Sequence, residues 1–536
     1  MSQKKKGDNL VITSSILAIA QIVVRLIGLF YRVPLMRIVG DEGMGYYSLA
    51  YEVYTFLLLI SSNGIPLALS LLLSSSLAKG EFRNAQRIFK CTMIFSGVIG
   101  GVFAVATFFG ATPIAHALFS TTNVAPSLRV IAPTILISAI LGVYRGYFQG
   151  KNSMVPTALS QVIEQIINAV VSVLAAWLLI RKGAAYGAAG SALGTCTGAF
   201  AAMAFCMLIY HIYRPTVRKL MKRDRTGHMM AQNQIYKLII MTMIPIILSQ
   251  TVFQLSGILD SSLYSKLLDI RGYTQTVRVE MYGVYNGEYK MLINVPLAIS
   301  SSIGIALIPM VTRAVTLNQI DDLRVRISSI VRLTMVISIP CCVGLMVLAA
   351  PIMQLLFSDY SELPVKLMLL GAPTIALYSL STVTISILQA IKQMRKPVTN
   401  SGIALIIHTV VLIGLLLFTD MNIYALVYGN YVFTFVVCLL NLRDLKKHAG
   451  YQMEYKNAVI LPTIVSLLMG VVTWISYKAV FAVVHNIIIA LVISVILSVA
   501  VFAVGVVVFG VLSEEDLYAM PKGNVLVGIC KKFHIM

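Results

Sequence analysis

Charged residues are scarce in this chain, and acidic residues are the rarer kind. Only 12% of the 536 residues are charged, with 21 Asp and Glu against 42 Lys and Arg, so the formal net charge is +21. Hydrophobic residues make up 58% of the chain, and the mean hydropathy is +0.86. Soluble domains average about 25% charged residues, so this balance excludes a soluble globular protein. The composition instead predicts a polytopic membrane protein.

Recognisable enzyme chemistry is missing as well. The patterns H-E-x-x-H and G-x-S-x-G and the nucleotide phosphate-binding loop do not occur, and the seven histidines are scattered. The seven cysteines are odd in number and imply no disulfide framework. A basic patch that binds nucleic acid needs a soluble face, and none is predicted. We therefore expect no enzymatic activity, no metal, no cofactor and no nucleic-acid partner.

Long apolar runs are what the chain has in abundance. A helix needs about 20 apolar residues to cross ~30 Å of hydrocarbon, and about fourteen such runs follow one another. The run "PIMQLLFS" at 351–358 is too short to span and is predicted to be an interfacial turn. The predicted fold class is an all-α polytopic membrane protein. Its helices are expected at 10–31, 45–77, 88–110, 127–148, 154–180, 185–211, 236–264, 281–312, 328–350, 364–390, 398–418, 422–442, 457–480 and 486–511.

Lysine and arginine set the predicted orientation. Most of the 42 basic residues lie at the termini and in alternate connections, and "YRPTVRKLMKRDR" at 213–225 is the most basic connection. Because cytoplasmic loops carry the excess of positive charge, both termini are predicted to be cytoplasmic. An alternative role for 213–225 is binding of anionic lipid headgroups. Lys4, Lys5 and Lys6 resemble the start of a secretory signal, but the spans that follow favour an uncleaved first helix.

An internal repeat organises the chain. "YEVY" at 51 and "GIPLALS" at 64 recur as "YGVY" at 282 and "NVPLAIS" at 294. The further matches are "PIAHALFS" at 113 with "PIMQLLFS" at 351, "APTI" at 132 and 372, and Gln149, Lys151 and Pro156 with Gln389, Lys392 and Pro397. Five matches in the same order at nearly one spacing are hard to attribute to chance.

The repeat predicts two lobes. Each unit holds six helices, an even number, so both units enter the membrane from the same side, as in transporters with two lobes around a central site. The predicted domains are the first lobe at 1–215, a basic cytoplasmic connection at 216–235, the second lobe at 236–445, and two further helices with a cytoplasmic tail at 446–536. Pro66 and Pro296 occupy matching positions and interrupt long helices, so they are either hinges beside a lobe cavity or structural kinks.

Helix 10–31 carries an arginine deep in the membrane. Gln21, Arg25, Gly28 and Arg32 share one helical stripe. An arginine at depth costs at least about 2.5 to 3.5 kcal/mol, so Arg25 should face protein or water. Two interpretations stand, which can coexist: a buried pair with Glu164 or Asp260, or contact with an anionic substrate.

Other spans also contain polar residues. In helix 154–180 these are Gln161, Glu164, Gln165 and Asn168, and in helix 236–264 they are Gln250, Gln254 and Asp260. The amides are either interhelical glue or functional groups, whereas Glu164 and Asp260 are candidates for coupling to an ion. Asn286, Glu288 and Lys290 in helix 281–312, with Glu52 as a rough counterpart, indicate a hydrated vestibule or a binding site. Gly190, Gly194 and Gly198 form a face typical of helix packing.

Four passages resemble one known family over essentially the whole chain. They are "RLIGLFYRVPLMRIVGDEGMGYYSLAYEVY", "GIPLALS", "VPTALSQVIEQ" and "YGVYNGEYKMLINVPLAISSSIGIALIPMVTRA". The chain thereby resembles the multidrug/oligosaccharidyl-lipid/polysaccharide exporter superfamily, and more narrowly its branch of stage V sporulation protein B and lipid II flippases. The resemblance implies a 14-helix flippase of the bacterial cytoplasmic membrane, which moves an undecaprenyl-diphosphate-linked saccharide by alternating access without hydrolysing nucleotide.

The resemblance also implies a site. In lipid II flippases, arginines of the first helix and basic residues of the second and eighth helices line a cationic cavity, and the two helices beyond the repeat form a groove for the lipid tail. This implies that Arg25, Arg32 and Lys290 contact the diphosphate, within a cavity that also includes Gln21, Glu52, Asn286 and Glu288. The Arg25–Arg32 spacing is one residue longer than in Gram-negative members. Leu71 and Asn168 stand where many relatives have a basic residue.

Three hypotheses for function follow. The first is a flippase for lipid II or a related cell-wall or polysaccharide precursor, driven by Na⁺, H⁺ or the membrane potential. The second is a cation-coupled drug exporter of the same superfamily, in which Glu164 and Asp260 couple transport to the ion. The third is a non-transporting sporulation or envelope factor. The expected partners are the lipid-linked oligosaccharide, bilayer lipids and proteins of cell-wall synthesis.

Overall fold

The described part of the chain is entirely helical. A computed structural model describes residues 2–226, 229–317 and 319–511. Within these ranges the description leaves out the side chains of residues 2–19, 63, 245–246, 248–250, 253, 301–307 and 309. Every regular element in these ranges is a helix, and no strand occurs among them. The predicted all-helical fold class is confirmed.

Contacts divide the chain into two compact units, Met1–Gly283 and Val284–Met536. The predicted lobe boundary at 216–235 follows the repeat instead, and it stays a prediction. The difference concerns α8, which packs against α1, α2, α3 and α4 of the first unit. The first unit contains α1 (Ser2–Leu58), η1 (Leu59–Asn63), α2 (Ile65–Ala78), α3 (Phe82–Phe109), α4 (Ala111–Phe119), α5 (Ala125–Gly150), α6 (Val155–Leu179), η2 (Ile180–Lys182), α7 (Ala184–Arg223) and α8 (Gln232–Ile270), and α9 (Gln275–Val284) ends at the boundary.

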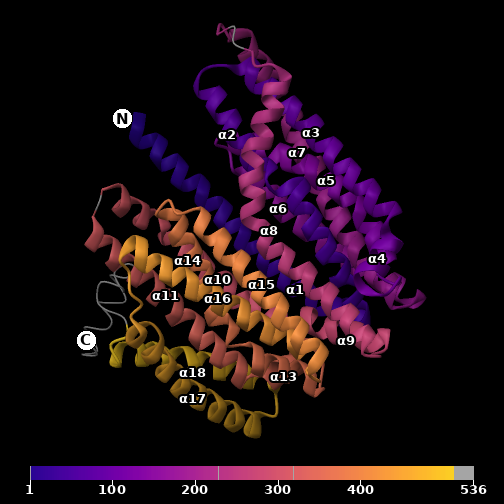
Figure 1. Cartoon of the computed structure of the whole chain (residues 1–536), viewed down its shortest axis with the longest axis vertical. Helices are drawn as coiled ribbons and strands as arrows, with labels where there is room; N and C mark the ends of the chain where they lie inside the picture. The colour runs from indigo at the N-terminus through magenta and orange to yellow at the C-terminus, as the bar shows by residue number, and fades with distance from the viewer. Residues whose placement is uncertain (1, 227–228, 318, 512–536) are drawn as a thin grey trace. The chain divides into compact units, whose positions relative to one another are not determined.

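The second unit repeats much of this order and adds two helices. In Figure 1 the added pair, α17 and α18, lie side by side. Within the unit, α17 also packs on α11, and α18 contacts α12. The elements are η3 (Tyr285–Tyr289), α10 (Lys290–Thr316), α11 (Ile320–Val347), α12 (Ala349–Phe357), α13 (Glu362–Gly371), α14 (Thr374–Ala390), α15 (Arg395–Phe418), α16 (Tyr424–Ala449), η4 (Lys456–Ile460), α17 (Leu461–Val484) and α18 (Ile487–Val508).

The predicted spans correspond to these helices. In the described ranges, 10 helical stretches are long and apolar enough to cross a membrane, or 11 if α13 and α14, bent by 44°, form one span. One of them, Ala20–Ala78, contains two predicted helices. The predicted spans at 236–264 and 281–312 correspond to α8 and to α9 with α10, in which several side chains are not described. The chain is therefore a multi-pass membrane protein.

Two predicted connections contain helical residues. Residues 32–44 were expected to link the first two spans, and α1 consists of two helices that meet within this range at a kink at Gly40, where φ is 67°. The predicted turn at 351–358 lies mostly in the short helix α12, which has Pro351 in its first turn, where proline is tolerated.

Local backbone geometry repeats between the two units. The matched segments at 113 and 351 lie in α4 and α12, which have 9 residues each. Both helices end at a serine in the left-handed region, Ser120 with φ of 51° and Ser358 with φ of 59°. The next positive φ shared by the repeat is at Asn152 and Lys392. The repeat is therefore visible in structure as well as in sequence.

Glycines allow close helix packing in the first unit. A Cβ added at Gly190 would lie 2.6 Å from the carbonyl oxygen of Ala175, and one at Gly198 would lie 2.5 Å from that of Glu164. The predicted glycine packing face of α7 is therefore confirmed, and it packs on α6. A second face was not predicted: a Cβ added at Gly146 on α5 would lie 2.8 Å from the Cα of Pro66. Such contacts leave no room for a side chain.

Both matching prolines lie near irregular helical turns. Pro66 is in the first turn of α2, directly after the π-helical turn η1. Pro296 is buried within α10, which follows the π-helical turn η3. A proline removes one backbone donor and crowds the preceding turn. The π turn η1 relieves that crowding at Pro66, whereas η3 ends seven residues before Pro296. The break expected at Pro66 is present, while a hinge role for either proline stays a prediction.

Candidate functional site

The first unit contains a group of tyrosines around one arginine. Arg32 of α1 is partly buried and interacts with Tyr31, Tyr47 and Tyr51 of the same helix, and it hydrogen-bonds with Tyr31. The Tyr47 hydroxyl lies 3.5 Å from Thr195 Oγ1 of α7, which ties this group to the neighbouring helix. Among the described residues, Arg32 forms no ion pair. The guanidinium is thus held by neutral groups and keeps its charge available for an anion.

Arg25 lies two helical turns before Arg32. Its side chain is exposed, and in the part of the chain that the structure describes it has neither a hydrogen bond nor an ion pair. Gln21, one turn earlier, is exposed as well. Between the arginines, the side-chain nitrogen Nε2 of Gln165 lies 3.2 Å from where a Cβ at Gly28 would be. The predicted stripe therefore changes from exposed to partly buried along its length.

The ion pair proposed for Arg25 belongs to another arginine. Arg145 Nη2 of α5 lies 2.6 Å from Glu164 Oε2 of α6, and Arg145 Nε donates to Ser160 Oγ at 2.9 Å. The side chains of this pair are 17% and 31% exposed, so both are mostly withdrawn from solvent. The interpretation that Arg25 pairs with Glu164 is therefore wrong, because α5 supplies the nearer cation.

Asn168 continues the polar face of α6. Its side-chain amide donates to the Tyr31 hydroxyl at 3.4 Å and accepts a hydrogen bond from Ser172 at 2.9 Å. These contacts are of the interhelical glue kind, which is typically worth about 0.6 to 2 kcal/mol. They join α6 to the tyrosines around Arg32.

Two carboxylates lie elsewhere in the first unit. Glu52 of α1 is partly buried, and its Oε2 lies 2.5 Å from where a Cβ at Gly257 of α8 would be. Asp260, one turn further along α8, is 5% exposed. Both carboxylates have interaction partners within the protein. Gln254 is partly buried, and the side chain of Gln250 lies outside the described residues.

The polar residues predicted in the second unit directly follow Tyr285 in the chain. Lys290 Nζ lies 4.8 Å from the ring centre of Tyr285, a cation–π distance. Glu288 is buried and Asn286 is partly buried in the adjacent π turn η3. The Tyr285 hydroxyl accepts from Asn430 at 2.7 Å, and Asn430 accepts from Tyr378 at 2.9 Å. The structure brings Asn286, Glu288 and Lys290 into one turn; their role as a vestibule or a binding site stays a prediction.

Several residues of these groups were missed in the sequence. Arg145 lies in the predicted span 127–148, so the depth argument applied to Arg25 would have found it. The tyrosines of α1 and Asn430 of α16 carry no such signal, because neutral polar residues are common in membrane helices. Only packing shows which of them meet a charge.

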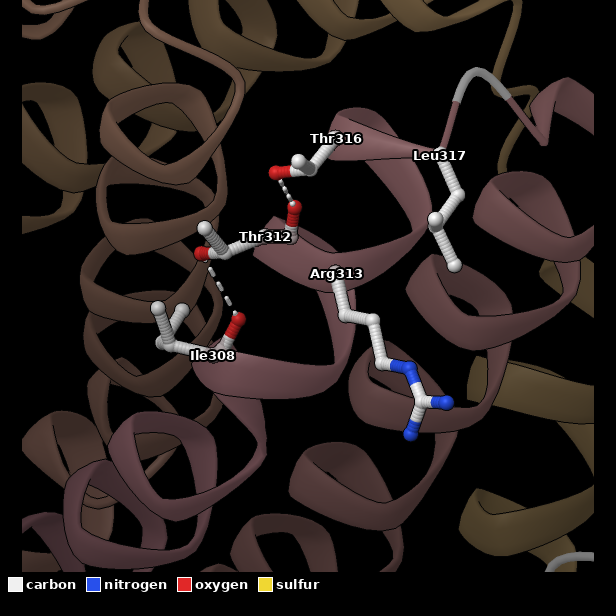
Figure 2. Close-up of a pocket in the computed structure, with 5 residues that line it drawn as sticks. All are labelled: Ile308, Thr312, Arg313, Thr316 and Leu317. Carbon is white, nitrogen blue, oxygen red and sulfur yellow. Dashed lines mark hydrogen bonds between the residues drawn. The ribbon is translucent and has the colours of Figure 1, made fainter. Parts of the chain in front are cut away.

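A surface cavity at the end of α10 lies away from these groups. It has a volume of about 620 Å³ and is lined by Ile308, Thr312, Arg313, Thr316 and Leu317 at the end of α10. Figure 2 shows the Arg313 side chain directed away from Thr312 and Thr316, whose hydroxyls donate to backbone carbonyls of the same helix. Lys290 lies 23 residues before Arg313 on α10, which corresponds to roughly 34 Å along the helix. This cavity therefore does not coincide with the predicted site.

Comparisons with known proteins agree on one family. A family model described as "Polysaccharide biosynthesis protein" matches residues 11–315, and the MatE model matches residues 290–413. Stage V sporulation protein B of Bacillus subtilis is 26% identical over 395 residues, which is 74% of this chain and 75% of that protein. Lipid II flippase MurJ of Bacillus subtilis is 24% identical over 476 residues, which is 85% of this chain and 86% of that protein.

Solved structures share the fold. Lipid II flippase MurJ in an inward closed conformation superposes with a TM-score of 0.67 at 14% identity, over 92% of this chain and 98% of that one. An inward-facing multidrug resistance MATE family transporter of the MOP superfamily has a TM-score of 0.66 at 16% identity, over 80% of this chain and 96% of that one. The same helical architecture therefore underlies both kinds of transporter.

Proposed function

The chain belongs to the polysaccharide biosynthesis protein family within the MOP superfamily of transporters, and from this premise we propose that it is a flippase for an undecaprenyl-diphosphate-linked saccharide. Lipid II or a related cell-wall precursor is the proposed cargo. The relatives are transporters and flippases, so the chain is a transporter and not an enzyme. The proposed cargo is supported by the similarity to a protein named lipid II flippase MurJ and by the arginines of α1.

The observation that carries the proposal is the state of these two arginines. Neither Arg25 nor Arg32 is paired with a carboxylate among the described residues, in contrast to Arg145. They are seven residues apart, roughly 10 Å along the helix. A diphosphate offers several oxygens to such guanidinium groups through charge-assisted hydrogen bonds. In the proposed cycle the arginines hold the diphosphate, and the lipid chain stays in the bilayer.

Orientation and driving force belong to the same proposal. Both termini are proposed to be cytoplasmic, so the basic connection at 213–225 lies on the side where lipid-linked precursors are made. Alternating access of the two lobes would then carry the headgroup outward. No nucleotide is required, because moving one charge across 100 mV is worth about 2.3 kcal/mol. Coupling to Na⁺ or H⁺ would add to this potential, and Asp260 is the proposed coupling carboxylate.

One observation favours a second candidate, a cation-coupled exporter. Asp260 is an almost fully buried carboxylate within α8, and Glu52 contacts the same helix one turn away. Buried carboxylates in membrane helices are the groups that bind coupling cations. Glu164 supports this candidate less, since its charge is neutralised by Arg145. In the exporter, Asp260→Asn would abolish transport of a cationic drug, whereas the arginines of α1 would matter little.

The proposed function is tested by reconstituting the full chain in proteoliposomes with lipid II. Arg32→Ala should lower the flipping rate at least tenfold, because the diphosphate loses a charge-assisted contact. Arg25→Ala should act in the same direction, and Arg32→Lys should recover part of the rate since lysine lacks the planar fork. Arg129→Ala is the matched control, because Arg129 is exposed and contacts only Thr112 among the described residues.

Normal flipping by a correctly inserted Arg25→Ala/Arg32→Ala double variant would exclude the diphosphate role. In cells, the same variants should fail to complement depletion of a lipid II flippase while accumulating to normal levels. Complementation by these variants, or failure of the unmodified chain at normal levels, would favour the exporter or a non-transporting sporulation factor.

A further inference from the structure

A second concentration of positive charge lies at one end of the first unit. A pocket of about 480 Å³ is lined by the first turns of α3, the last turns of α7 and Met229. Its lining contains five cationic side chains, Arg83, Arg87, Lys90, Arg218 and Lys222, together with Gln86, Met221 and Met229. No acidic residue lines it. The pocket is separate from the arginines of α1, which lie in another helix.

The charges of this pocket are poorly compensated. None of the five cations takes part in an ion pair among the described residues. The nearby Asp224 carboxylate accepts a hydrogen bond from the Arg83 backbone N–H at 2.8 Å. Like charges that converge on one small volume repel each other unless an anion lies between them. The arrangement therefore fits an anionic ligand.

Hydrogen bonds and ring stacking hold the helices around the pocket in place. The Arg83 side chain donates from Nε to the carbonyl oxygen of Met221 at 3.1 Å, which joins α3 to α7. Gln86 donates to the Tyr210 hydroxyl at 2.7 Å, and the Tyr210 ring stacks on Phe89 with centroids 4.9 Å apart. A pocket with a fixed floor binds at lower entropic cost than one that must form on binding.

The helix that carries three of the cations continues into an apolar stripe. Lys90 is followed at intervals of four residues by Ile94, Val98 and Val102, which are 58%, 59% and 62% exposed. Residues spaced by four lie on one helical face, and in a span such an exposed aliphatic face contacts lipid chains. The pocket thus lies where a headgroup would be if its acyl chains followed α3.

We propose that this pocket binds the phosphate headgroup of an anionic phospholipid, with Arg87, Lys90 and Arg218 as its main contacts and the acyl chains along Ile94 and Val98. Basic pockets between membrane helices bind anionic headgroups in this way. The two methionines can adapt their flexible side chains to the glycerol backbone. The positive-inside rule alone accounts for basic residues on this side, but it does not require them to converge on one pocket.

The test uses the full-length protein in detergent micelles with added phosphatidylglycerol or phosphatidylcholine, and native mass spectrometry counts the bound lipids. The unmodified protein should retain phosphatidylglycerol at least tenfold better. The variant Arg87→Gln/Lys90→Gln/Arg218→Gln should lose this preference, at about fivefold per removed charge. The matched control is Arg443→Gln/Lys446→Gln/Lys447→Gln, which removes three exposed charges at the end of α16 and should change retention less than twofold.

Further variants keep the test decisive if the triple variant does not fold. Arg87→Lys/Arg218→Lys should keep the preference, since the charge is retained, and Lys90→Gln alone should weaken it about fivefold. Equal retention of both lipids, or an unchanged preference in the folded triple variant, would overturn the proposal. Inorganic phosphate that binds the pocket while phosphatidylglycerol does not would also overturn it, in favour of a soluble anion.

Discussion

The two repeat units have different side chains at matching positions of their helices. In the first unit, α5 and α6 are joined by the ion pair of Arg145 and Glu164. At the repeat offsets of "APTI" and of Pro156 with Pro397, the matching positions of α14 and α15 are Ile385 and Leu405. Leu405 is 8% exposed, so apolar side chains occupy these positions in the second unit. The ion pair is therefore not repeated in the second unit.

The hydrogen bonds of matching tyrosines also differ between the two units. The hydroxyl of Tyr54 lies 3.4 Å from Ser138 Oγ in the first unit. The matching Tyr285 and Tyr378 of the second unit both hydrogen-bond to Asn430. In the second unit Tyr285 also lies 4.8 Å from Lys290 Nζ. The hydrogen-bond partner of the matching tyrosine therefore differs between the units: a serine hydroxyl in the first unit and an asparagine amide in the second.

The largest effect is expected from breaking the ion pair on one side. Glu164→Leu leaves the mostly buried guanidinium of Arg145 without its carboxylate, so the free energy of unfolding should fall by about 2 kcal/mol, less than for a fully buried pair because both groups are partly exposed. The double variant Arg145→Ile/Glu164→Leu installs the residues of the second unit and should recover to within about 1 kcal/mol of the unmodified protein. Unfolding in mixed detergent and sodium dodecyl sulfate micelles measures the free energy of unfolding of both variants.

The same variants distinguish an effect on stability from an effect on transport. If the double variant is stable but flips no lipid, the pair has a functional role that Ile385 and Leu405 do not share. A double variant as unstable as the sum of its single variants would show instead that the two units pack differently at this point.

An effect of similar size is expected where α5 meets α2. Gly146→Ala places a Cβ 2.8 Å from the backbone of Pro66, and overpacking of this kind should cost about 1 to 3 kcal/mol. The matching position in α14 is Ser386, which already has a side chain and donates to the Thr382 carbonyl. Ser386→Ala should therefore change the free energy of unfolding by less than about 0.5 kcal/mol. Comparable losses for the two variants would contradict a closer helix approach in the first unit.

The smallest effect concerns acidic residues that follow the last helix of each repeat. Hydrogen bonds from the Arg83 backbone and from Thr226 lower the pKa of Asp224 to about 2. Burial alone would raise the pKa of Glu454, but hydrogen bonding from Ser328 and the charge of Arg332 lower it overall. A carboxylate whose pKa is lower in the folded state contributes stability that is present above its unfolded pKa of about 4 and is lost as the pH falls through the folded value.

Acidification from pH 7 to pH 3 should therefore lower the melting temperature of the unmodified protein more than that of Asp224→Asn or Glu454→Gln. The variants should be less stable than the unmodified protein at pH 7, and this difference should shrink as the pH falls towards 2. Parallel curves for all three proteins would show that these two carboxylates do not contribute to the acid sensitivity.

Helix positions were predictable, and side-chain partners were not. The apolar runs predicted the long helices of the described ranges because hydrocarbon thickness sets their length, whereas the short helix α12 was expected to be a turn. The connection predicted at 32–44 contains the kink at Gly40, where two helices meet. The partner of Glu164 was misread because the sequence does not show that Arg145, near the end of another predicted span, faces α6.

By itself the sequence determined that this protein crosses the membrane many times, that it is built from a repeat, and that arginines lie within its first unit. Tertiary structure alone decided which arginine is neutralised, which is surrounded by tyrosines, and that the ends of α3 and α7 form a cationic pocket. The physical reason is that membrane helices are apolar on both their packed and their lipid-facing sides, so periodicity along one helix does not reveal its neighbours. Partners in space are set by helix packing, to which residues more than a hundred positions apart contribute.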